Sequence, residues 1–346
     1  MSAVPVSSTP AVVHGVGVVV ASDDGRVRFF GQDLERVFWE TRLDRSVYSS
    51  VVVDTERDRF VVATTGGLVA CIGLRGDVAW TRVLPEPVFS TPTILPERRT
   101  LVIGTFGSHC VFVDLDDGAV IADVSTPRPW SAALGGLAAH RDVYASPVVR
   151  DEDSVVVCSG DHVVAIGRDG TVLWSVDTGA TIKASPVVVG DRVVVAGTNG
   201  VVRTLALLDA QEICATTVGA RIAASPVVVD GVAVVGDQTG RVHGLDTDRL
   251  APQWQNSTGA PRSYTSFSTL PDGAVIATGF DGDVRCIDPR DGAFRWQSSQ
   301  VLGLPDHEPE MDITPVAAPD GSLYCASYRG DVYRFAFRPD DGGVSS

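Results

Sequence analysis

Short runs of hydrophobic residues, separated by polar turns rich in glycine and aspartate, recur along the whole chain. Three segments share the letters ASPVV, and they start at Ala145, Ala184 and Ala224. Each continues with a polar turn, a second apolar run, a glycine and a third apolar run. Apolar runs of this length between turn residues are typical of short β-strands. The pattern therefore predicts an all-β chain made of repeats.

Less regular copies extend the pattern to eight units. Taking the serine or threonine near the start of each unit as a marker, the markers are Thr9, Ser50, Thr91, Ser146, Ser185, Ser225, Ser266 and Thr314, at intervals of 41, 41, 55, 39, 40, 41 and 48 residues. Five of the six tryptophans, at positions 39, 80, 174, 254 and 296, follow their markers by 28 to 30 residues. Units of about four short strands bury their faces only against one another. We predict a single eight-bladed β-propeller domain of four-stranded antiparallel blades over residues 1–346.

Each unit also contains a glycine 14 to 16 residues after its marker. These are Gly25, Gly66, Gly107, Gly160, Gly200, Gly240, Gly282 and Gly330, and we expect a tight turn with positive φ at each. The last unit ends where its fourth strand should begin. Ring closure then depends either on a weak strand near Val344 or on pairing by Val4 to Val6.

The pattern SPVV…G…DG.V..LD..TG...W resembles the repeat of the pyrroloquinoline quinone-type propellers over nearly the whole chain. The resemblance implies the propeller fold, with tryptophans packed between neighbouring blades. It implies no single function, because such repeats occur in alcohol dehydrogenases, in an outer-membrane assembly lipoprotein and beside a β-alanine-activating enzyme.

Quinone-dependent members of that family hold the quinone between a tryptophan and a vicinal disulfide, with calcium or a lanthanide ion beside it. Here the six cysteines are never adjacent, and they form no CxxC pair. The acidic runs 114–117 and 151–153 fall in predicted turns and lack the spacing of a calcium loop. We therefore expect buried cysteines, no quinone, no other cofactor and no metal.

Charge narrows the possible partners. The chain has 43 acidic residues against 28 lysines and arginines, which gives a net charge of −15. Such a chain is not expected to bind nucleic acid or an anionic membrane. The first residues show no export signal, and no long apolar run follows, so we expect a cytoplasmic protein.

The connections between blades should meet at one mouth of the central channel, together with the turns between the second and third strands. Residues two and four positions before each marker should face that mouth, because side chains alternate along an extended segment. This predicts a ligand-binding ring of Tyr48, Phe89, Tyr144, Arg221, Arg262, Asp142 and Glu310, with Lys183, Tyr264 and Asp312 as candidate catalytic residues.

The two long intervals place extra residues in blade connections on the same face. They are 125–144 and 301–312, and they precede blades four and eight, opposite each other in the ring. Long loops on a rigid scaffold often carry function. We expect Trp130 and His307 to overhang the mouth as part of a lid or a partner surface.

Lys183 is the only lysine in the chain. A buried, unpaired lysine among aromatic rings has a lowered pKa and can act as a base or nucleophile. A nearby carboxylate would instead keep it charged, as a structural ion pair or as the anchor of a ligand carboxylate.

Two functions follow from these residues. The first is a binding or scaffold module that presents the mouth to a small acidic ligand or to a protein partner, such as a carrier protein or a biosynthetic enzyme. The alternative is a quinone-independent, non-redox enzyme of small-molecule metabolism with its active site around Lys183.

Overall fold

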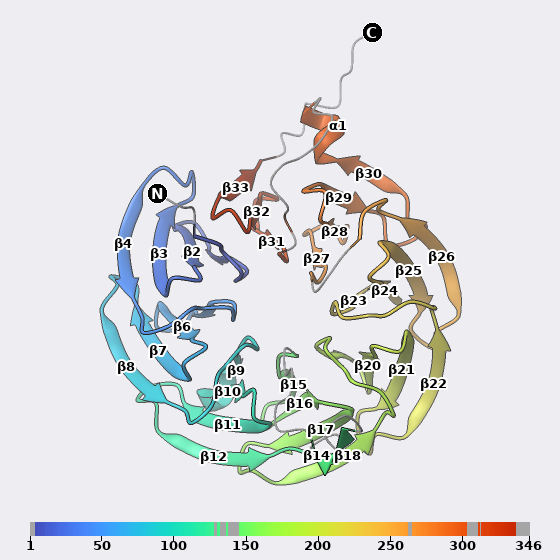
Figure 1. The fold of residues 1–346 in the computed structure, drawn as a ribbon, viewed down its shortest axis with the longest axis horizontal. Coiled ribbons are helices and arrows are strands. Elements are labelled where there is room, and N and C mark those ends of the chain that lie inside the picture. The colour runs from blue at the N-terminus through green and yellow to red at the C-terminus, as the bar shows by residue number, and fades with distance from the viewer. Residues whose placement is uncertain are drawn as a thin grey trace.

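The computed structural model shows a ring of eight blades around a central axis (Figure 1). It describes residues 4–127, 145–261, 265–302, 311 and 313–336, and the backbone of the two short strands at 130–131 and 136–137. Seven blades are four-stranded antiparallel sheets with strands in sequence order, which confirms the predicted architecture. No helix in this part of the chain is long and apolar enough to cross a membrane.

In each of the first four blades, the strands are ordered from the innermost, beside the central axis, to the outermost. Blade 1 has β1 (Ala11–Val13), β2 (Gly17–Ala21), β3 (Arg26–Gly31) and β4 (Val37–Arg42). Blade 2 has β5 (Val52–Asp54), β6 (Arg59–Ala63), β7 (Leu68–Gly73) and β8 (Val78–Val83). Blade 3 has β9 (Thr93–Leu95), the 3-10 helix η1 (Pro96–Arg98), β10 (Thr100–Gly104), β11 (His109–Asp114) and β12 (Val120–Ser125). After the hairpin β13 (Trp130–Ser131) and β14 (Gly136–Leu137), blade 4 has β15 (Val148–Asp151), β16 (Ser154–Ser159), β17 (His162–Gly167) and β18 (Val172–Asp177).

The second half repeats the arrangement. Blade 5 has β19 (Val187–Val189), β20 (Arg192–Ala196), β21 (Val201–Ala206) and β22 (Glu212–Thr217). Blade 6 has β23 (Val227–Val229), β24 (Val232–Gly236), β25 (Arg241–Asp246) and β26 (Pro252–Ser257). Blade 7 has β27 (Ser268–Thr269), β28 (Val275–Thr278), β29 (Val284–Ile287) and β30 (Phe294–Gln297), followed by α1 (Ser298–Leu302). Blade 8 has β31 (Val316–Ala317), β32 (Leu323–Ala326) and β33 (Val332–Phe335).

The second strand of each blade is buried on both faces, which explains its unbroken apolar sequence. Every residue of β2, β10 and β16 is buried, whereas the outermost strands, such as β4 and β22, alternate between exposed and half-buried positions. Each hydrophobic cluster joins neighbouring blades, as when Val19 and Phe29 of blade 1 pack with Phe60 of blade 2. The core is therefore a series of interfaces between blades.

The tryptophans of the outer strands connect each blade to the next. The indole N–H of Trp39, Trp80, Trp174 and Trp254 donates to the carbonyl oxygens of Leu74 (2.8 Å), Leu115 (3.0 Å), Leu207 (3.0 Å) and Pro289 (2.7 Å), respectively. A Cβ on Gly118 would lie only 2.6 Å from Cε3 of Trp80, so the turn beneath this indole requires glycine. These contacts confirm that the tryptophans pack between blades.

The prediction of a positive φ is wrong for two of the eight turn glycines. Positive φ occurs at six of them, but in blade 2 it falls on Gly67 and not Gly66, and in blade 3 it falls on Ser108 and not Gly107. A Cβ at Gly107 would lie 1.7 Å from Oε1 of Glu86, so a larger residue there would displace the end of that side chain. Ser108 adopts, at φ 75°, a conformation that is favourable only for glycine.

The ring closes by packing between blades 8 and 1. Val6 and Val18 share a hydrophobic cluster with Tyr324, whose hydroxyl donates to the carbonyl oxygen of Gln32 at 2.9 Å. The N–H of Val6 donates to Ser327 O at 3.3 Å, so Val4 to Val6 lie along a turn of blade 8 and do not form its fourth strand. In the described residues blade 8 has three strands, and Val344 lies outside them.

Candidate functional site

Backbone hydrogen bonds build the channel mouth in the predicted way. The second residue of the turn between strands two and three donates its N–H to the residue four positions before the marker of the same blade. Thr65 donates to Ser46 O (2.9 Å), Phe106 to Pro87 O (2.9 Å), Thr198 to Thr181 O (2.8 Å) and Gln238 to Arg221 O (2.9 Å). Connections and turns therefore lie at one end of the ring, as the sequence predicted.

The marker residues themselves form a chain of hydrogen bonds around the channel. The N–H of Ser50 donates to the hydroxyl of the next marker, Thr91, at 3.0 Å. The N–H of Thr91 in turn donates to Ser146, and the series continues in the same way to Thr314. The successive distances after the first are 3.0 Å to Ser146, 2.8 Å to Ser185, 2.9 Å to Ser225, 3.0 Å to Ser266 and 3.0 Å to Thr314. This explains why the unit requires serine or threonine at this position. It also fixes the connection that carries the mouth side chains two and four residues earlier.

The structure places four of the predicted site residues. Tyr48, Phe89, Lys183 and Arg221 all lie in blade connections at the mouth. The others, Tyr144, Asp142, Tyr264, Arg262, Glu310, Asp312 and His307, lie outside the described residues, and of Trp130 only the backbone in β13 is described.

Burial alternates along the connections into blades 2 and 5, as predicted for extended segments, but not along the connection into blade 6, where Ile222, Ala223 and Ala224 are all buried. Tyr48 is exposed between the buried Val47 and Ser49. Lys183 is half-buried between the buried Ile182 and Ala184. The buried residues pack between blades, so their neighbours are directed away from the core.

Blades 5 and 6 contribute two cationic side chains to the mouth. Lys183 lies in the connection into blade 5, and Arg221 lies at the exposed start of the corresponding stretch into blade 6. Ala223 takes the position in blade 6 that Lys183 has in blade 5, so it adds little bulk there. Among the described residues, the Arg221 guanidinium has no ion-pair partner.

An aromatic cluster lies on the side of blades 2 and 3. The ring centroids of Tyr48 and Phe89 are 5.6 Å apart, and those of Phe89 and Phe106 are 4.9 Å apart, with tilted planes. The sequence analysis missed Phe106 because it considered only the connections. The second turn position, which holds Phe106, Phe280 and Tyr328, was the signal that could have revealed it.

One group of described side chains has the composition of a cation site. The possible ligand atoms of Asp161, His162 and Asp177 lie within 4.8 Å of one another, and His162 Nδ1 is 2.6 Å from Asp161 Oδ1. The sequence analysis overlooked the group because Asp177 is distant along the chain and reaches His162 only through the pairing of β17 with β18. In the structure, Asp161 and His162 bond to each other, so Nδ1 of His162 is already used.

The cysteines and acidic turns do not form the site that a quinone and its metal require. Five of the six free cysteines are buried, and all six lie in different blades, so no two are adjacent. Burial raises the pKa of the Cys71 thiol to about 11 and that of Cys325 to about 12. In the acidic turns, Asp153 pairs with Arg98 at 2.6 Å and Asp116 with Arg99 at 2.7 Å. The described residues therefore do not fit the quinone centre.

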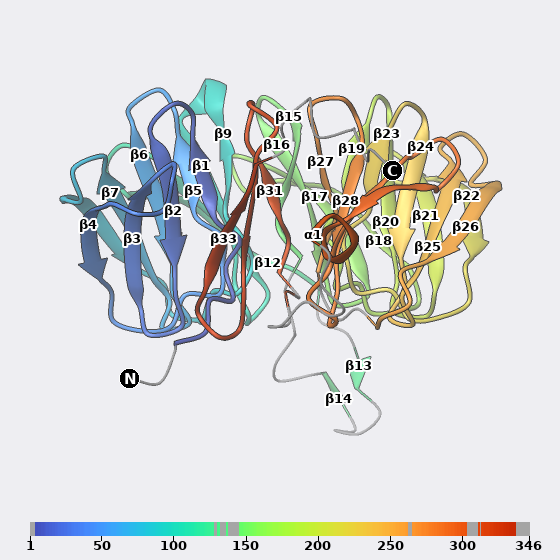
Figure 2. The same cartoon turned by 90° about the horizontal axis from the view of Figure 1, so that it is seen from above.

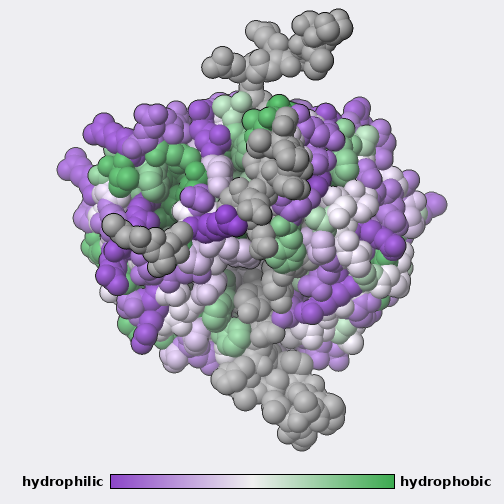
Figure 3. All heavy atoms as spheres, turned by 45° about the horizontal axis from the view of Figure 1, so that its top comes forward, coloured by the Kyte–Doolittle hydropathy of each residue, from purple (hydrophilic) through white to green (hydrophobic). Residues whose placement is uncertain are grey.

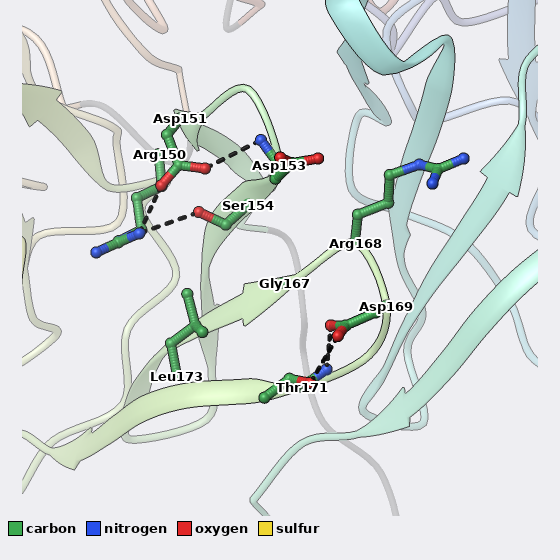
Figure 4. A pocket seen from close by; sticks show the side chains of 9 residues that line it. All are labelled: Arg150, Asp151, Asp153, Ser154, Gly167, Arg168, Asp169, Thr171 and Leu173. Atoms are coloured by element: carbon green, nitrogen blue, oxygen red, sulfur yellow. Dashed lines mark hydrogen bonds and ion pairs between the residues drawn. The ribbon is translucent and has the colours of Figure 1, made fainter.

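A polar cleft of about 470 Å³ lies in blade 4, between the turn after β15 and the turn after β17 (Figure 4). These turns lie at the end of the blade opposite the mouth, because successive turns of an antiparallel sheet alternate between its two ends. Arg150 donates to Asp151 (2.5 Å), Ser154 (3.2 Å) and the carbonyl oxygen of Leu207 (3.2 Å). Since this arginine already holds blades 4 and 5 together, the cleft is a weaker candidate than the mouth.

The two long connections differ in position. Figure 2 shows β13 and β14 projecting beyond the blades at the end where the chain enters blade 1, so this part of the 125–144 insertion lies at the mouth. The second insertion begins with α1, which packs along β29 and β30 about halfway up the blades. Asp283 holds this helix by accepting hydrogen bonds from Ser298 Oγ and Ser299 Oγ, both at 2.7 Å.

The surface is mainly hydrophilic, with hydrophobic patches interrupted by polar residues on the side seen in Figure 3. This agrees with the net charge of −15. At the mouth, by contrast, the blade connections carry the aromatic rings of Tyr48 and Phe89 and the cations of Lys183 and Arg221.

Comparisons with known proteins agree with the fold. The model of the family described as outer membrane protein assembly factor BamB matches residues 1–167 and 159–341. A β-alanine-activating enzyme of Drosophila melanogaster is 24% identical over 187 residues, which are 50% of this chain and 18% of that enzyme. BamB from Moraxella catarrhalis superposes with a TM-score of 0.79 at 16% identity, covering 97% of this chain and 99% of BamB. Sqt1 of Saccharomyces cerevisiae gives a TM-score of 0.75 at 15% identity, covering 97% of this chain and 99% of Sqt1.

Proposed function

This chain belongs to the family of the outer membrane protein assembly factor BamB, whose members are propellers with PQQ-type repeats, and on that premise we propose that it is a binding module. Its channel mouth holds a carboxylate group, carried by a small acidic ligand or by an acidic segment of a protein partner. Lys183 and Arg221 provide the positive charge, and the aromatic rings of Tyr48 and Phe89, on the side of blades 2 and 3, provide apolar contact area.

The observation that carries this proposal is the pair of cations on adjacent connections. In a chain with 43 acidic and 28 basic residues, most arginines near carboxylates form ion pairs, as Arg98 and Arg99 do. Arg221 is exposed and unpaired within the described part of the chain, and Lys183 lies in the next connection. Two cations held on a rigid backbone are suited to a carboxylate, because little conformational freedom is lost on binding.

Arg221 and Lys183 differ in what they contribute. A guanidinium offers a planar pair of donors for both carboxylate oxygens, whereas an ammonium acts as a point charge. Lys183 is half-buried, so its interaction with an anion is screened less than that of a fully exposed lysine. We therefore expect Lys183 to contribute more to affinity and Arg221 more to selectivity among carboxylates.

A titration monitored by thermal unfolding tests the proposal. Dicarboxylates such as glutarate, and capped peptides rich in aspartate and glutamate, should raise the unfolding temperature with increasing concentration, because they bind only the folded state. Lys183→Ala should abolish this shift. Arg334→Ala is the matched control, because it removes a cation from blade 8 that pairs with Asp320.

Equal shifts in the wild type and Lys183→Ala, or shifts lost equally in Arg334→Ala, would contradict the proposal. The enzyme interpretation depends on Tyr264 and Asp312, which lie outside the described residues. No observation on the described residues favours it over binding.

A further inference from the structure

The mouth has the opposite chemical character on the side of blades 1 to 3. Here the connections supply Ser7, Tyr48 and Phe89 in consecutive blades, and the turn of blade 1 supplies Asp23. Tyr48 is 42% exposed although its ring contacts Phe89. An aromatic ring that packs on a neighbour and remains open to solvent presents a π face to a ligand.

Asp23 is a carboxylate held in place by neutral donors. Its Oδ1 accepts from the N–H of Ser7 at 3.2 Å, and its Oδ2 accepts from Ser7 Oγ at 2.9 Å. Both bonds come from Ser7, which is itself the mouth residue of the connection into blade 1. The carboxylate is therefore oriented at the mouth, and Ser7 leaves its negative charge uncompensated.

Asp23 differs from two other carboxylates of blade 1, whereas Asp44 and Glu86, in the connections into blades 2 and 3, accept from Thr64 and Thr105 and likewise have no ion pair among the described residues. In blade 1, Asp24 lies 3.3 Å from the guanidinium of Arg26, and Glu40 lies 2.8 Å from that of Arg28. Among the described residues, Asp23 has no such cationic partner. A carboxylate that keeps its charge without a cation is stabilised when a ligand supplies one.

Asp23 and Tyr48 lie on backbone segments that are directly joined, because the N–H of Val47 donates to the carbonyl oxygen of Ser22 at 3.4 Å. Burial, followed by the charge of Asp23, raises the pKa of the Tyr48 hydroxyl, as expected when an anion lies near the phenol. Burial also raises the pKa of Asp23 itself, and the charge of Asp24 adds to the effect. A cation placed beside Tyr48 would therefore interact with both the ring and the carboxylate.

We propose that Asp23, Tyr48 and Phe89 form a subsite that receives a basic side chain, lysine or arginine, of a protein partner. An organic cation suits the site better than a metal ion. One carboxylate with aromatic faces matches an alkylammonium or guanidinium group, whereas calcium and magnesium require several oxygen ligands.

A protein side chain suits the subsite better than a free small cation. Tyr48 opens outward at the end of the ring and is not enclosed, so a side chain can reach it from a partner surface. The net charge of −15 also attracts a basic partner over long range at low salt. This inference rests on the proposed binding function and adds a second, oppositely charged contact at the same mouth.

Fluorescence anisotropy of a labelled, capped peptide carrying four arginines and no acidic residue tests the subsite on the full chain. We expect saturable binding that weakens about fivefold or more in both Asp23→Asn and Tyr48→Leu. Tyr48→Leu retains apolar contact but removes the π face, and Asp23→Asn removes the charge but keeps a hydrogen-bond acceptor. Asp169→Asn, in an exposed turn at the opposite end of blade 4, should change affinity less than twofold.

Equal weakening by Asp169→Asn would show attraction to the net charge alone and would overturn the proposal. Binding of arginine methyl ester as tight as that of the peptide, with the same dependence on Asp23 and Tyr48, would overturn the assignment to a partner side chain. The peptide has no carboxylate, so Lys183→Ala should not weaken it. Failure of the acidic ligands with success of this peptide would refute the proposed function and leave the subsite intact.

Discussion

Replacing Ser108 by glycine should stabilise the protein. Ser108 has φ 75°, where the turns of the seven other blades place a glycine of similar φ, among them Gly67 and Gly200. Its hydroxyl is buried, and within the described part of the chain it has no hydrogen-bond partner. The residue therefore combines backbone strain with an unsatisfied polar group.

The expected gain can be worked out from these two features. The left-handed conformation costs a non-glycine residue about 1–2 kcal/mol, and an unsatisfied buried hydroxyl costs about 1–3 kcal/mol. Against this, glycine adds about 0.4–1 kcal/mol of unfolded-state entropy, and one lost buried carbon costs about 0.8 kcal/mol. These ranges combine to a gain of about 0.2–3.8 kcal/mol, so Ser108→Gly should raise the free energy of unfolding by about 2 kcal/mol.

Urea unfolding measures this change as a shift of the midpoint with unchanged slope. Gly67→Ser is the matched control in blade 2, because a Cβ there would lie 2.5 Å from Leu84 O and 2.7 Å from Glu86 O. It should destabilise the protein. A neutral or destabilising Ser108→Gly would mean that the Ser108 hydroxyl makes a stabilising contact, and the reasoning would be refuted.

Three further predictions concern the packing of the blades. Trp174→Ala should destabilise by about 3–5 kcal/mol in urea unfolding, because it removes a buried ring and the hydrogen bond to Leu207 O; a near-neutral result would disprove the role of the tryptophans. Burial tends to raise the pKa of Asp283, but hydrogen bonds from Ser298 and Ser299 and the charge of Arg285 hold it below its usual value. A carboxylate with a lowered pKa stabilises the folded state at pH values above its unfolded pKa of about 3.9, and this stabilisation is lost as the pH falls further. Asp283→Asn should therefore lower the free energy of unfolding at pH 7 and differ less from the wild type below about pH 4. A difference that stays constant with pH would contradict this. A thiol reagent should modify Cys214 first in the folded protein, because the other five cysteines are buried; fast labelling of Cys71 or Cys325, followed by peptide mass spectrometry, would contradict the burial.

The repeat made most of the fold predictable from the sequence. The spacing of the markers and tryptophans identified every blade, because each unit meets the same neighbours and needs the same residues for the same contacts. The turns of blades 2 and 3 were mispredicted because two adjacent small residues, Gly66 and Gly67 or Gly107 and Ser108, can each take the positive φ.

The mouth was predictable in position and less so in composition. Tyr48, Phe89 and Lys183 lie in connections at the mouth with the expected alternation of burial, whereas in the connection that contains Arg221 the three residues 222–224 are all buried. Phe106 and Asp23 were missed because they come from the turns of blades 3 and 1, and their contacts with the connections depend on how the strands pair. The group of Asp161, His162 and Asp177 was missed for the same reason.

The acylation rate of Lys183 tests the central claim most directly, because no other lysine exists in the chain. The rate is measured by peptide mass spectrometry, with and without a saturating capped peptide of aspartate and glutamate. If the mouth binds carboxylates through Lys183, the acidic peptide should slow acylation, and the same peptide with asparagine and glutamine should not. An equal rate in all three conditions would contradict the claim that this mouth is a carboxylate-binding site.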